Sequence, residues 1–570
     1  MTQLPAPVPS LCAVVVVPAR DEAARIRYCL AGLARQREVK LDTYEVIVVL
    51  DGCRDHTRRA LEEFACQTPD LTVHAVELEN SLGVGRARRL GMDLACQRLL
   101  SLAADGGLIA STDADSVVAP DWLATQLELS KRGAHAIGGL IELDPEESRV
   151  LPAAVAERER RATTRMREVL NKAAPQDTTE HHQFSGASLA VSAAVYQRCG
   201  GLPVRAALED EALEHELSLL GVPIHRSRRV RVSTSARTSG RAPRGLARDL
   251  ASSDWCSRRC YTAGEFPLER LLDAKQSTIG LILPAREVAQ TIRPIAELSL
   301  TLQEAGLLDE VLVIDAASHD GTAEIAEQAG ISVLQESELS REYGPACGKG
   351  DAMWRALRAT SSEIVAYADT DTRDFKRHFL LGILGPLICE PDVQFVKGAF
   401  RRPFRNGVTQ LRDGGGRVTE LMARPLLNLH APELAVFNQP LAGETAARRE
   451  LLERLPFSAG YGVEIAMLID AWRAVGLDGL AQVDLGVRQN RHQPLRDLSA
   501  MAYAVLLAAQ TRFLGEDFAD AHACGSMAIP ALDDPVRMET RRVTVQERPP
   551  LTSLCGQQPL DLVRARAGRG

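Results

Sequence analysis

Two kinds of hydrophobic pattern alternate along this chain. The first is a short run of branched apolar residues, which occurs at 12–17, 44–50, 71–76 and 107–112 and again at 278–283, 310–314, 331–334 and 363–367. The second is a longer segment with apolar positions every three or four residues, as at 83–98. The short runs predict buried strands, and the periodic segments predict helices that cover them. Their alternation predicts an α/β fold with a doubly wound, Rossmann-like sheet.

The second series of runs repeats the first. The first run of each series ends in P-A-R and an acid, starting at Pro18 and Pro284. The second run ends in Asp51 or Asp315 with a D-x-T close behind, and the fourth ends in Asp-x-Asp. This order predicts two copies of one domain, and 570 residues are too many for one core. We expect domains at 1–240 and 277–535, a linker at 241–276, and an extended or disordered tail at 536–570.

The two Asp-x-Asp motifs, Asp113 with Asp115 and Asp369 with Asp371, are candidate metal sites. Residues i and i+2 of an extended strand point to the same side, so both acids of a motif can face one small volume. Neighbouring carboxylates repel unless a cation separates them or one is protonated. One or two carboxylates with phosphate oxygens are the usual ligands of Mg²⁺. An acidic turn after a strand is common, so the repeat of the motif carries the interpretation.

The composition excludes several classes of protein. A net charge of −8 and only 4% aromatic residues argue against a nucleic-acid binder or a base-stacking platform. No apolar run approaches the length of a membrane span, and the first residues lack a signal-peptide pattern. The 12 cysteines include no CxxC pair, so we expect reduced thiols and a cytoplasmic location.

Three other segments are candidate sites. The acids of 208–217 are read either as functional or as a solvated helix face with favourable charge near its N-terminus. Residues 226–248 hold eight arginines and no acid, which fits an anion-binding loop or a solvated basic linker equally well. The sequence G-G-G-R-V-T at 414–419 precedes a predicted helix, and backbone N–H groups there favour an anion. Glu464 is a lone acid among apolar helix positions, which usually means a partner or a role in function.

The first half resembles glycosyltransferase family 2, whose domains have the GT-A fold. The resemblance rests on V-V-V-V-P-A-R-D-E, V-V-L-D-G-C-R-D-H-T, D-A-D, G-A-S-L-A-V and the E-D pair at 209–210. It implies an inverting transferase in which Pro18, Ala19 and Asp51 meet the nucleotide and Asp113 meets the donor diphosphate. It also implies that Asp115 binds the metal. Asp210 would be the base that deprotonates the acceptor hydroxyl, which must lie within hydrogen-bond reach.

The second half resembles the glucosyl-3-phosphoglycerate synthases, which are retaining GT-A enzymes. The matching motifs are P-A-R-E, D-T-D, G-G-G-R-V-T, Q-P-L-A-G-E and L-P-F-S-A-G-Y-G-V-E-I. The resemblance implies transfer of glucose from UDP-glucose to 3-phosphoglycerate with Mg²⁺ or Mn²⁺, and it is compatible with a homodimer. The implied donor contacts are Pro284, Ala285, Arg286, Asp315, Lys349, Asp369, Thr370 and Arg488. The implied acceptor contacts are Gly416, Arg417, Val418 and Thr419, with Asp371 on the metal and Glu464 and Tyr461 orienting the reacting groups.

The second half departs from this family in two places. The family sequence P-A-L-N-E-E is here P-A-R-E-V-A, so the second acid is absent. The family's metal-ligating histidine corresponds to Asn490, and His492 lies where the family has an acceptor-contacting asparagine. Either Asn490 supplies an oxygen ligand or His492 takes its place.

The sequence thus predicts two tandem GT-A, nucleotide-sugar-binding domains. The main functional hypothesis is a tandem glycosyltransferase, with glucosyl-3-phosphoglycerate synthesis in the second half and an unidentified acceptor in the first. The alternative is one catalytic half with a non-catalytic, metabolite-binding or scaffolding partner. A sugar-phosphate nucleotidyltransferase is disfavoured because neither half has a glycine-rich loop after its first strand. UDP-glucose is favoured for the second half by the resemblance, and a GDP-sugar stays open on the sequence alone.

Overall fold

The chain folds into two compact units, Met1–Asp254 and Trp255–Gly570. The computed structural model describes residues 4–104, 106–172, 177–205, 207–240, 244–406, 409–411, 414–488, 494–532 and 536–554. No helix in these ranges is long and apolar enough to cross a membrane. The cysteines within them are all free.

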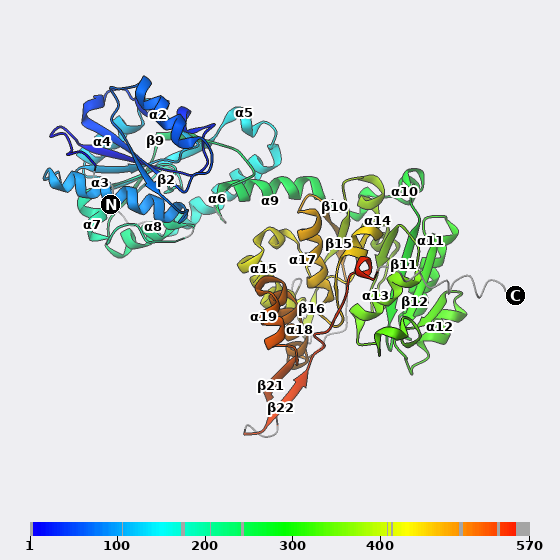
Figure 1. The fold of residues 1–570 in the computed structure, drawn as a ribbon. Helices are drawn as coiled ribbons and strands as arrows, with labels where there is room; N and C mark the ends of the chain where they lie inside the picture. Colours follow the sequence, from blue (N-terminus) through cyan, green and yellow to red (C-terminus); the bar gives the residue numbers. More distant parts are fainter. Residues whose placement is uncertain are drawn as a thin grey trace. The chain divides into compact units, whose positions relative to one another are not determined.

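Unit 1 is built on a nine-stranded sheet with helices on both faces (Figure 1). Its strands are β1 (Ala13–Ala19), β2 (Tyr44–Asp51), β3 (Val73–Leu78), β4 (Leu108–Ser111), β5 (Ser116–Val118), β6 (Ala136–Leu143), β7 (Thr178–Thr179), β8 (Leu189–Ser192) and β9 (Ile224–Thr234). Its helices are α1 (Ile26–Ala34), α2 (Thr57–Gln67), α3 (Val84–Ser101), α4 (Trp122–Lys131), α5 (Pro145–Ser148), α6 (Pro152–Lys172), α7 (Ala193–Arg198) and α8 (Glu209–Leu219). Helix α9 (Leu246–Arg259) crosses the boundary between the units.

The strand sequences of unit 1 explain its two layers. Alternate residues of a strand face opposite sides of the sheet. In β1, Val15 and Val17 join one buried cluster, whereas Val14 and Val16 join another. Every residue of β1 and β2 is buried, as expected for central strands of a sheet that is covered on both faces.

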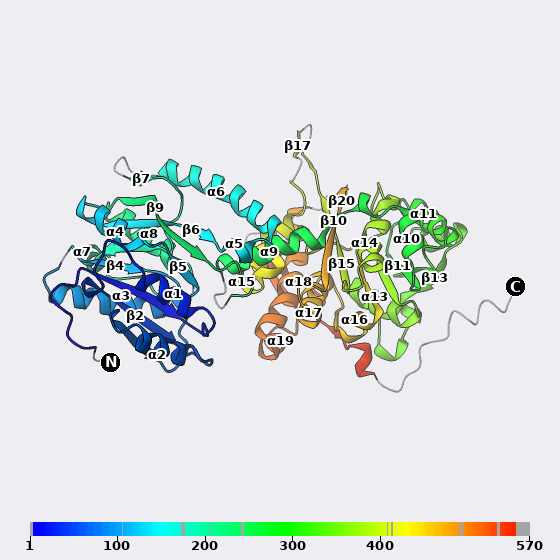
Figure 2. The same ribbon diagram turned by 90° about the horizontal axis from the view of Figure 1, so that it is seen from above.

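Unit 2 has an eight-stranded sheet and three short two-stranded ribbons (Figures 1 and 2). Its strands are β10 (Cys260–Thr262), β11 (Ile279–Ala285), β12 (Glu310–Asp315), β13 (Ser332–Gln335), β14 (Ile364–Tyr367), β15 (Phe395–Arg401), β16 (Phe404–Asn406), β17 (Thr409–Leu411), β18 (Thr445–Arg448), β19 (Phe457–Ser458), β20 (Leu480–Val487), β21 (Ser526–Pro530), β22 (Met538–Arg542) and β23 (Glu547–Arg548). Its helices are α10 (Leu268–Ala274), α11 (Ile292–Glu304), α12 (Thr322–Gln328), α13 (Lys349–Ala359), α14 (Arg377–Cys389), α15 (Arg424–His430), α16 (Arg449–Arg454), α17 (Val463–Val475), α18 (Leu495–Leu514) and α19 (Glu516–Ala521).

The predicted internal repeat is confirmed by the strand order. Unit 1 runs β3-β2-β1-β4-β8-β6-β9, and unit 2 runs β13-β12-β11-β14-β18-β15-β20. The predicted α/β, doubly wound fold is therefore correct for both units. Each sheet contains one strand, β8 or β18, that is antiparallel to both of its neighbours. Both sheets are therefore mixed, and neither is fully parallel.

The structure corrects two of the expected boundaries. Residues 241–276 are not only a linker, because β10 pairs with β20 and forms an edge of the second sheet. Residues 536–554 are also structured: β22 pairs with β21, and β23 pairs with β19. The Arg- and Pro-rich composition of the tail hid these strands; in addition, β19, the partner of β23, lies far away in sequence, although β21 and β22 are close neighbours.

Candidate active sites

The Asp369–Asp371 motif lies just beyond β14 in unit 2, where its first acid meets a lysine. Lys349, the first residue of α13, bonds Asp369 Oδ1 at 2.5 Å and Glu464 Oε1 at 2.8 Å. Glu464 comes from the first turn of α17. Three residues predicted separately as donor-binding or catalytic are thus brought together around one ammonium group.

Arg488 forms a second charged junction at the end of β20. Its guanidinium bonds Asp369 Oδ2 at 3.1 Å, Asp371 Oδ1 at 3.2 Å and Glu444 Oε1. The Arg488 side chain is fully buried, whereas the Asp371 side chain is 60% exposed. We expected Arg488 to bind donor diphosphate, but in this structure its charge is engaged by three carboxylates. Glu444 was not predicted, because it precedes a buried strand and only the fold brings it to the motif.

The charges of this cluster shift one another strongly. Burial raises the pKa of Asp369, but Lys349 and Arg488 outweigh it and hold that pKa well below its usual range. Burial and the charge of Asp369 raise the pKa of Asp371. Burial also raises the pKa of Glu444, even with Arg488 beside it. Asp371, the exposed acid of the motif, is thus the one whose negative charge is not fully balanced by neighbouring cations. Such a carboxylate suits a ligand for a cation from solution.

Two glycines make this packing possible. A Cβ at Gly443 would lie 2.1 Å from Asp369 Oδ1. Gly348 has φ +119°, a conformation that a side chain disfavours, and precedes Lys349 at the start of α13.

The residues predicted to contact uridine lie beside the motif. Asp315 ends β12 and accepts hydrogen bonds at Oδ2 from Ser318 N and Gln335 Nε2. Its buried Oδ1 has no hydrogen-bond partner among the residues described. Pro284 and Ala285 end the neighbouring β11, and Arg286 is exposed after them. The Thr370 hydroxyl donates to Pro284 O at 2.6 Å, so it ties the two loops together.

The predicted acceptor loop lies before α15. Gly416 has φ +69°, and residues Thr419–Ala423 form a π-helical turn that leads into α15. Val418 and Thr419 are buried, which makes Val418 a core residue. Arg417 is half-buried, and Tyr461 is 58% exposed at the start of α17. Asn490 and His492 lie outside the described residues.

A C-terminal segment supports this site, and the sequence did not predict it. Arg548 is buried and forms a two-pronged bond to Asp351, at 2.6 Å and 2.8 Å. Asp351 lies in α13, two residues after Lys349. In the same segment, Gln546 O accepts a hydrogen bond from Ala459 N, two residues before Tyr461. Residues 546–548 therefore join α13, which begins at Lys349, to the segment that precedes α17, the helix of Glu464.

Unit 1 brings its own predicted acids together at the same end of its sheet. Arg88 of α3 bonds Asp113 Oδ1 at 2.8 Å and Glu209 Oε1 at 3.1 Å. Arg237, beyond β9, bonds Asp115 Oδ2 at 2.8 Å and Glu22 Oε1 at 2.7 Å. Burial and the charge of Asp113 raise the pKa of Asp115 to about 6. The cations Arg88 and Arg237 were missed as site residues, since nothing near them in sequence marks their partners.

The other predicted residues of unit 1 also have definite places. Pro18 and Ala19 end β1 beside Leu50 of β2. Asp51 is buried and accepts hydrogen bonds from Ser81 Oγ, Leu82 N and Gly83 N. Asp210, in the first turn of α8, accepts a hydrogen bond from Gly186 N at 3.0 Å.

The basic segment 226–248 is neither a simple loop nor a solvated linker. Its first part is strand β9, in which Arg226 pairs with Glu214 at 2.6 Å. Arg229 pairs with Glu128 at the surface. Together with Arg237, these arginines hold the sheet to its helices and to the acids at its edge.

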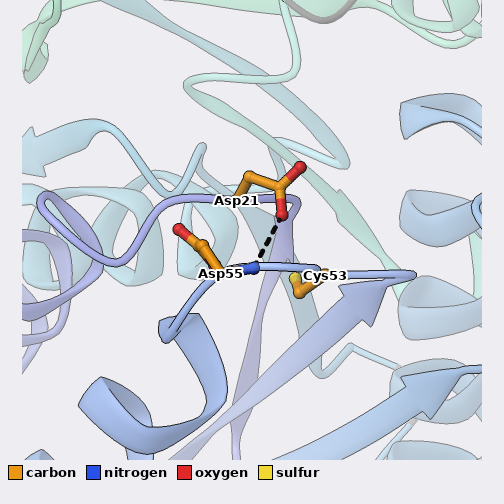
Figure 3. A group of neighbouring side chains, drawn as sticks. All are labelled: Asp21, Cys53 and Asp55. Atoms are coloured by element: carbon orange, nitrogen blue, oxygen red, sulfur yellow. Dashed lines mark hydrogen bonds between the residues drawn. The ribbon is translucent and has the colours of Figure 1, made fainter.

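Asp21, Cys53 and Asp55 form another acidic group in unit 1 (Figure 3), and their ligand atoms lie within 4.8 Å of one another. Asp21 accepts a hydrogen bond from Arg54 N at 2.7 Å, and Asp55 accepts others from Ala23 N and Thr57 N. Unit 2 repeats these bonds with Glu287, which accepts from His319 N, and Asp320, which accepts from Ala289 N and Thr322 N. The repetition indicates that this group fastens the first two strand-end loops together.

Comparison with known proteins gives two results. The family described as Glycosyl transferase family 2 matches residues 14–186. Glucosyl-3-phosphoglycerate synthase of Mycolicibacterium smegmatis is 40% identical over 301 residues, which are 53% of this chain and 98% of that protein. The Mycobacterium tuberculosis H37Rv protein of the same name is 43% identical over 272 residues, covering 47% and 81%.

Solved structures include similar chains. Mannosyl-3-phosphoglycerate synthase from Rubrobacter xylanophilus is 44% identical and covers 53% of this chain and 99% of its own, with a TM-score of 0.48. Glucosyl-3-phosphoglycerate synthase from Mycobacterium tuberculosis, solved with Mn²⁺, UDP-glucose and phosphoglyceric acid, is 38% identical and covers 50% and 95%, with a TM-score of 0.45. The same protein was also solved with Mg²⁺ and UDP.

The relative from Mycolicibacterium smegmatis is matched over nearly its whole length, at an identity well above the level at which only the fold is shared. The chain therefore belongs to the glucosyl-3-phosphoglycerate synthase family of glycosyltransferases.

Proposed function

We propose that unit 2 is the glucosyl-3-phosphoglycerate synthase and that it transfers glucose from UDP-glucose to 3-phosphoglycerate. The length of the match supports this assignment. The alignment with the Mycolicibacterium smegmatis protein covers 301 residues, which is more than Met1–Asp254 contains and fewer than Trp255–Gly570 contains. The motifs that carry the resemblance also lie between Pro284 and Arg488.

The observation that carries the proposal is the cluster of four carboxylates around Lys349 and Arg488. The Asp369–Asp371 motif, Glu444 and Glu464 come from three different parts of the unit and meet at the carboxyl ends of its strands. Ligands of open α/β sheets bind at this edge. The exposed Asp371 fits a Mg²⁺ or Mn²⁺ ion, with Asn490 or His492 proposed as its further protein ligand. The ion would neutralise charge on the leaving diphosphate.

The remaining roles follow from the hydrogen bonds that each residue has or lacks. Asp315 Oδ1 is a free acceptor for the N–H of uracil, beside Pro284, Ala285 and Arg286. Lys349 holds Asp369 and Glu464 in fixed relation, so that Glu464 faces the donor sugar. Gly416, Arg417 and Thr419 would hold the phosphoglycerate, and Tyr461 would orient it.

The test is an assay of UDP release by the full chain with UDP-glucose, Mg²⁺ and 3-phosphoglycerate. Asp371→Ala should abolish the release that depends on 3-phosphoglycerate, because it removes the exposed metal ligand. Asp115→Ala is the matched control, as it removes the corresponding acid of unit 1. Equal loss in both variants, or release by the wild type no greater than by Asp371→Ala, would sink the assignment.

For unit 1 we propose an inverting sugar transfer with Asp210 as the base. The match of residues 14–186 to glycosyltransferase family 2 supports it, as does the position of Asp210 one strand away from Asp113 and Asp115. A screen of UDP- and GDP-sugars by calorimetry, in the Asp371→Ala background, tests donor binding by unit 1. Donor binding without turnover would favour the alternative of a non-catalytic, metabolite-binding unit.

A further inference from the structure

Beside Asp210, unit 1 carries a group of basic side chains that its donor site does not use. They are Arg158 and Arg165 of α6, His181 and His182 of the segment after β7, and Arg226 of β9. We propose that this basic group is a binding subsite for an anion, and that it holds a phosphate group on the acceptor of unit 1. The assignment to an acceptor rests on the proposed sugar transfer by unit 1.

Arg158 gives the first argument. Its side chain is half-buried, and its Nη2 donates one hydrogen bond to Ile141 O at 2.7 Å. Arg88, Arg98, Arg226 and Arg237 of the same unit each pair with a carboxylate. Within the described part of the chain, no carboxylate forms a salt bridge with Arg158. Glu142 attracts the Arg158 guanidinium electrostatically but forms no salt bridge with it in the described part of the chain, so this partly desolvated guanidinium is poised to receive an anion.

The neighbours of Arg158 are positive as well. The Gln183 side chain bonds the same carbonyl, Ile141 O, so His182, the chain neighbour of Gln183, lies close to Arg158 in space. Arg165 lies seven residues after Arg158, on the same face of α6. Burial, Arg165, His181, Arg158 and Arg226 together lower the pKa of His182 to about 4. His182 is thus neutral at pH 7, and its ring N–H can donate to an anion among the arginines.

Arg226 links the basic group to α8, the helix that carries Asp210. Arg226 pairs with Glu214, which follows Asp210 by four residues on the same face of α8. Gly186 N bonds Asp210, and the segment from His181 to Gly186 runs directly between the basic group and this carboxylate. An acceptor whose hydroxyl reaches Asp210 can therefore place an anionic group among these side chains.

The internal repeat gives an independent argument. In unit 2, the glycine-rich loop 414–419 belongs to the connection between β15 and β18. The corresponding connection of unit 1 runs between β6 and β8, and it contains Arg158, Arg165, His181 and His182. The two connections differ in sequence and in length, yet each places basic or anion-attracting groups beside the acids of its sheet.

The experiment measures the binding of inorganic phosphate by calorimetry. The full chain carries Arg417→Gln throughout, which removes the proposed anion site of unit 2. Arg158→Gln with Arg165→Gln should lower phosphate affinity at least tenfold. The control, Arg160→Gln with Arg167→Gln, removes the same charge from the other face of α6 and should leave affinity unchanged. Circular dichroism checks that both variants fold.

Two outcomes would overturn the proposal. They are no phosphate binding in the Arg417→Gln background, and equal phosphate affinity in the two double variants. Asp210→Asn should strengthen phosphate binding severalfold, because a neighbouring negative charge is removed; no change would overturn the assignment to the acceptor. Phosphate binding by unit 1 without any sugar-nucleotide binding would preserve the anion site and refute the proposed sugar transfer instead.

Discussion

The two units place their acids identically and neutralise them differently. In unit 1, the first acid of the motif pairs with Arg88, the fifth residue of α3. In unit 2, it pairs with Lys349, the first residue of α13. The second acid pairs with an arginine beyond the last long strand in both, Arg237 or Arg488. The sheet thus determines where the carboxylates lie, whereas the counter-charge of the first acid can come from different positions of the helix that precedes its strand.

The aspartate after the second strand differs more. Asp51 accepts three hydrogen bonds from the short loop at Ser81–Gly83. Asp315 keeps one buried oxygen without a partner among the described residues, and a longer loop follows β13. Unit 1 therefore uses its aspartate to hold a loop, whereas Asp315 Oδ1 is the acceptor that we propose for a nucleotide base. Similar motifs thus form different hydrogen bonds in the two copies.

The largest expected difference between the units is the loss in free energy of unfolding when Arg488 or Arg237 is replaced by alanine. Arg488→Ala should lower the free energy of unfolding of unit 2 by about 3–5 kcal/mol, because Asp369 and Glu444 lose a buried partner. Arg237→Ala should lower that of unit 1 by less, since the Arg237 side chain keeps 19% exposure and Asp115 can take up a proton. Urea denaturation measures both values. Equal losses would remove the contrast between the two junctions.

The C-terminal segment, which has no counterpart in unit 1, gives the next prediction. Arg548→Ala should destabilise unit 2 by about 3 kcal/mol and reduce 3-phosphoglycerate-dependent UDP release at least tenfold, because Asp351 loses two charge-assisted bonds. Arg542→Ala, at an exposed position of β22, is the control and should change neither. Sugar-nucleotide binding by unit 1 should be unaffected by both substitutions.

The two motifs should also respond differently to pH. The folded-state pKa of Asp115 is raised to about 6, so its protonated form favours folding and this contribution is lost as the pH rises through 6. Between pH 4.5 and 6.5 the loss should be about 2 kcal/mol. The Asp369 pKa is lowered, so its contribution is constant over that range and is lost only in strong acid. Asp115→Asn should flatten the pH dependence of unfolding, and Asp369→Asn should not.

The smallest expected effect is at Lys397, which occupies the position of Gly138 in unit 1. Lys397 is buried, its nearest partners are Thr445 Oγ1 and Glu464 O at 3.5 Å, and burial lowers its pKa to about 8. Lys397→Met should change the free energy of unfolding by less than about 1 kcal/mol, because it removes an ammonium that is costly to bury. Lys397→Gly, which copies unit 1, should cost more through the cavity it leaves.

The parts of this structure that could be predicted are those whose signal lies within a short stretch of the sequence. Apolar runs gave the central strands, and the repeated P-A-R and Asp-x-Asp motifs identified the two copies and the edge where their acids meet. The partners of those acids could not be predicted. Arg488 and Asp369 are 119 residues apart in sequence, Arg237 and Glu22 are 215 apart, and Arg548 and Asp351 are 197 apart. The sequence does not show whether an arginine binds a phosphate or a carboxylate. The assignment of Arg488 to the donor diphosphate therefore rested on the family resemblance.

The bond between Arg548 and Asp351 also has a consequence for biosynthesis. Domains fold largely as they leave the ribosome, beginning with the N-terminal one. Asp113, Asp115 and their partners are all translated by residue 237, so unit 1 can complete its cluster while most of unit 2 is still being made. Unit 2 has the strands of its eight-stranded sheet and its acids by residue 488, but Asp351, which pairs with Arg355 of its own helix, meets Arg548 only after a further 60 residues are made. During that interval Asp351 is paired with Arg355, and synthesis of residues 546–548 adds the second guanidinium that joins α13 to the segment before α17.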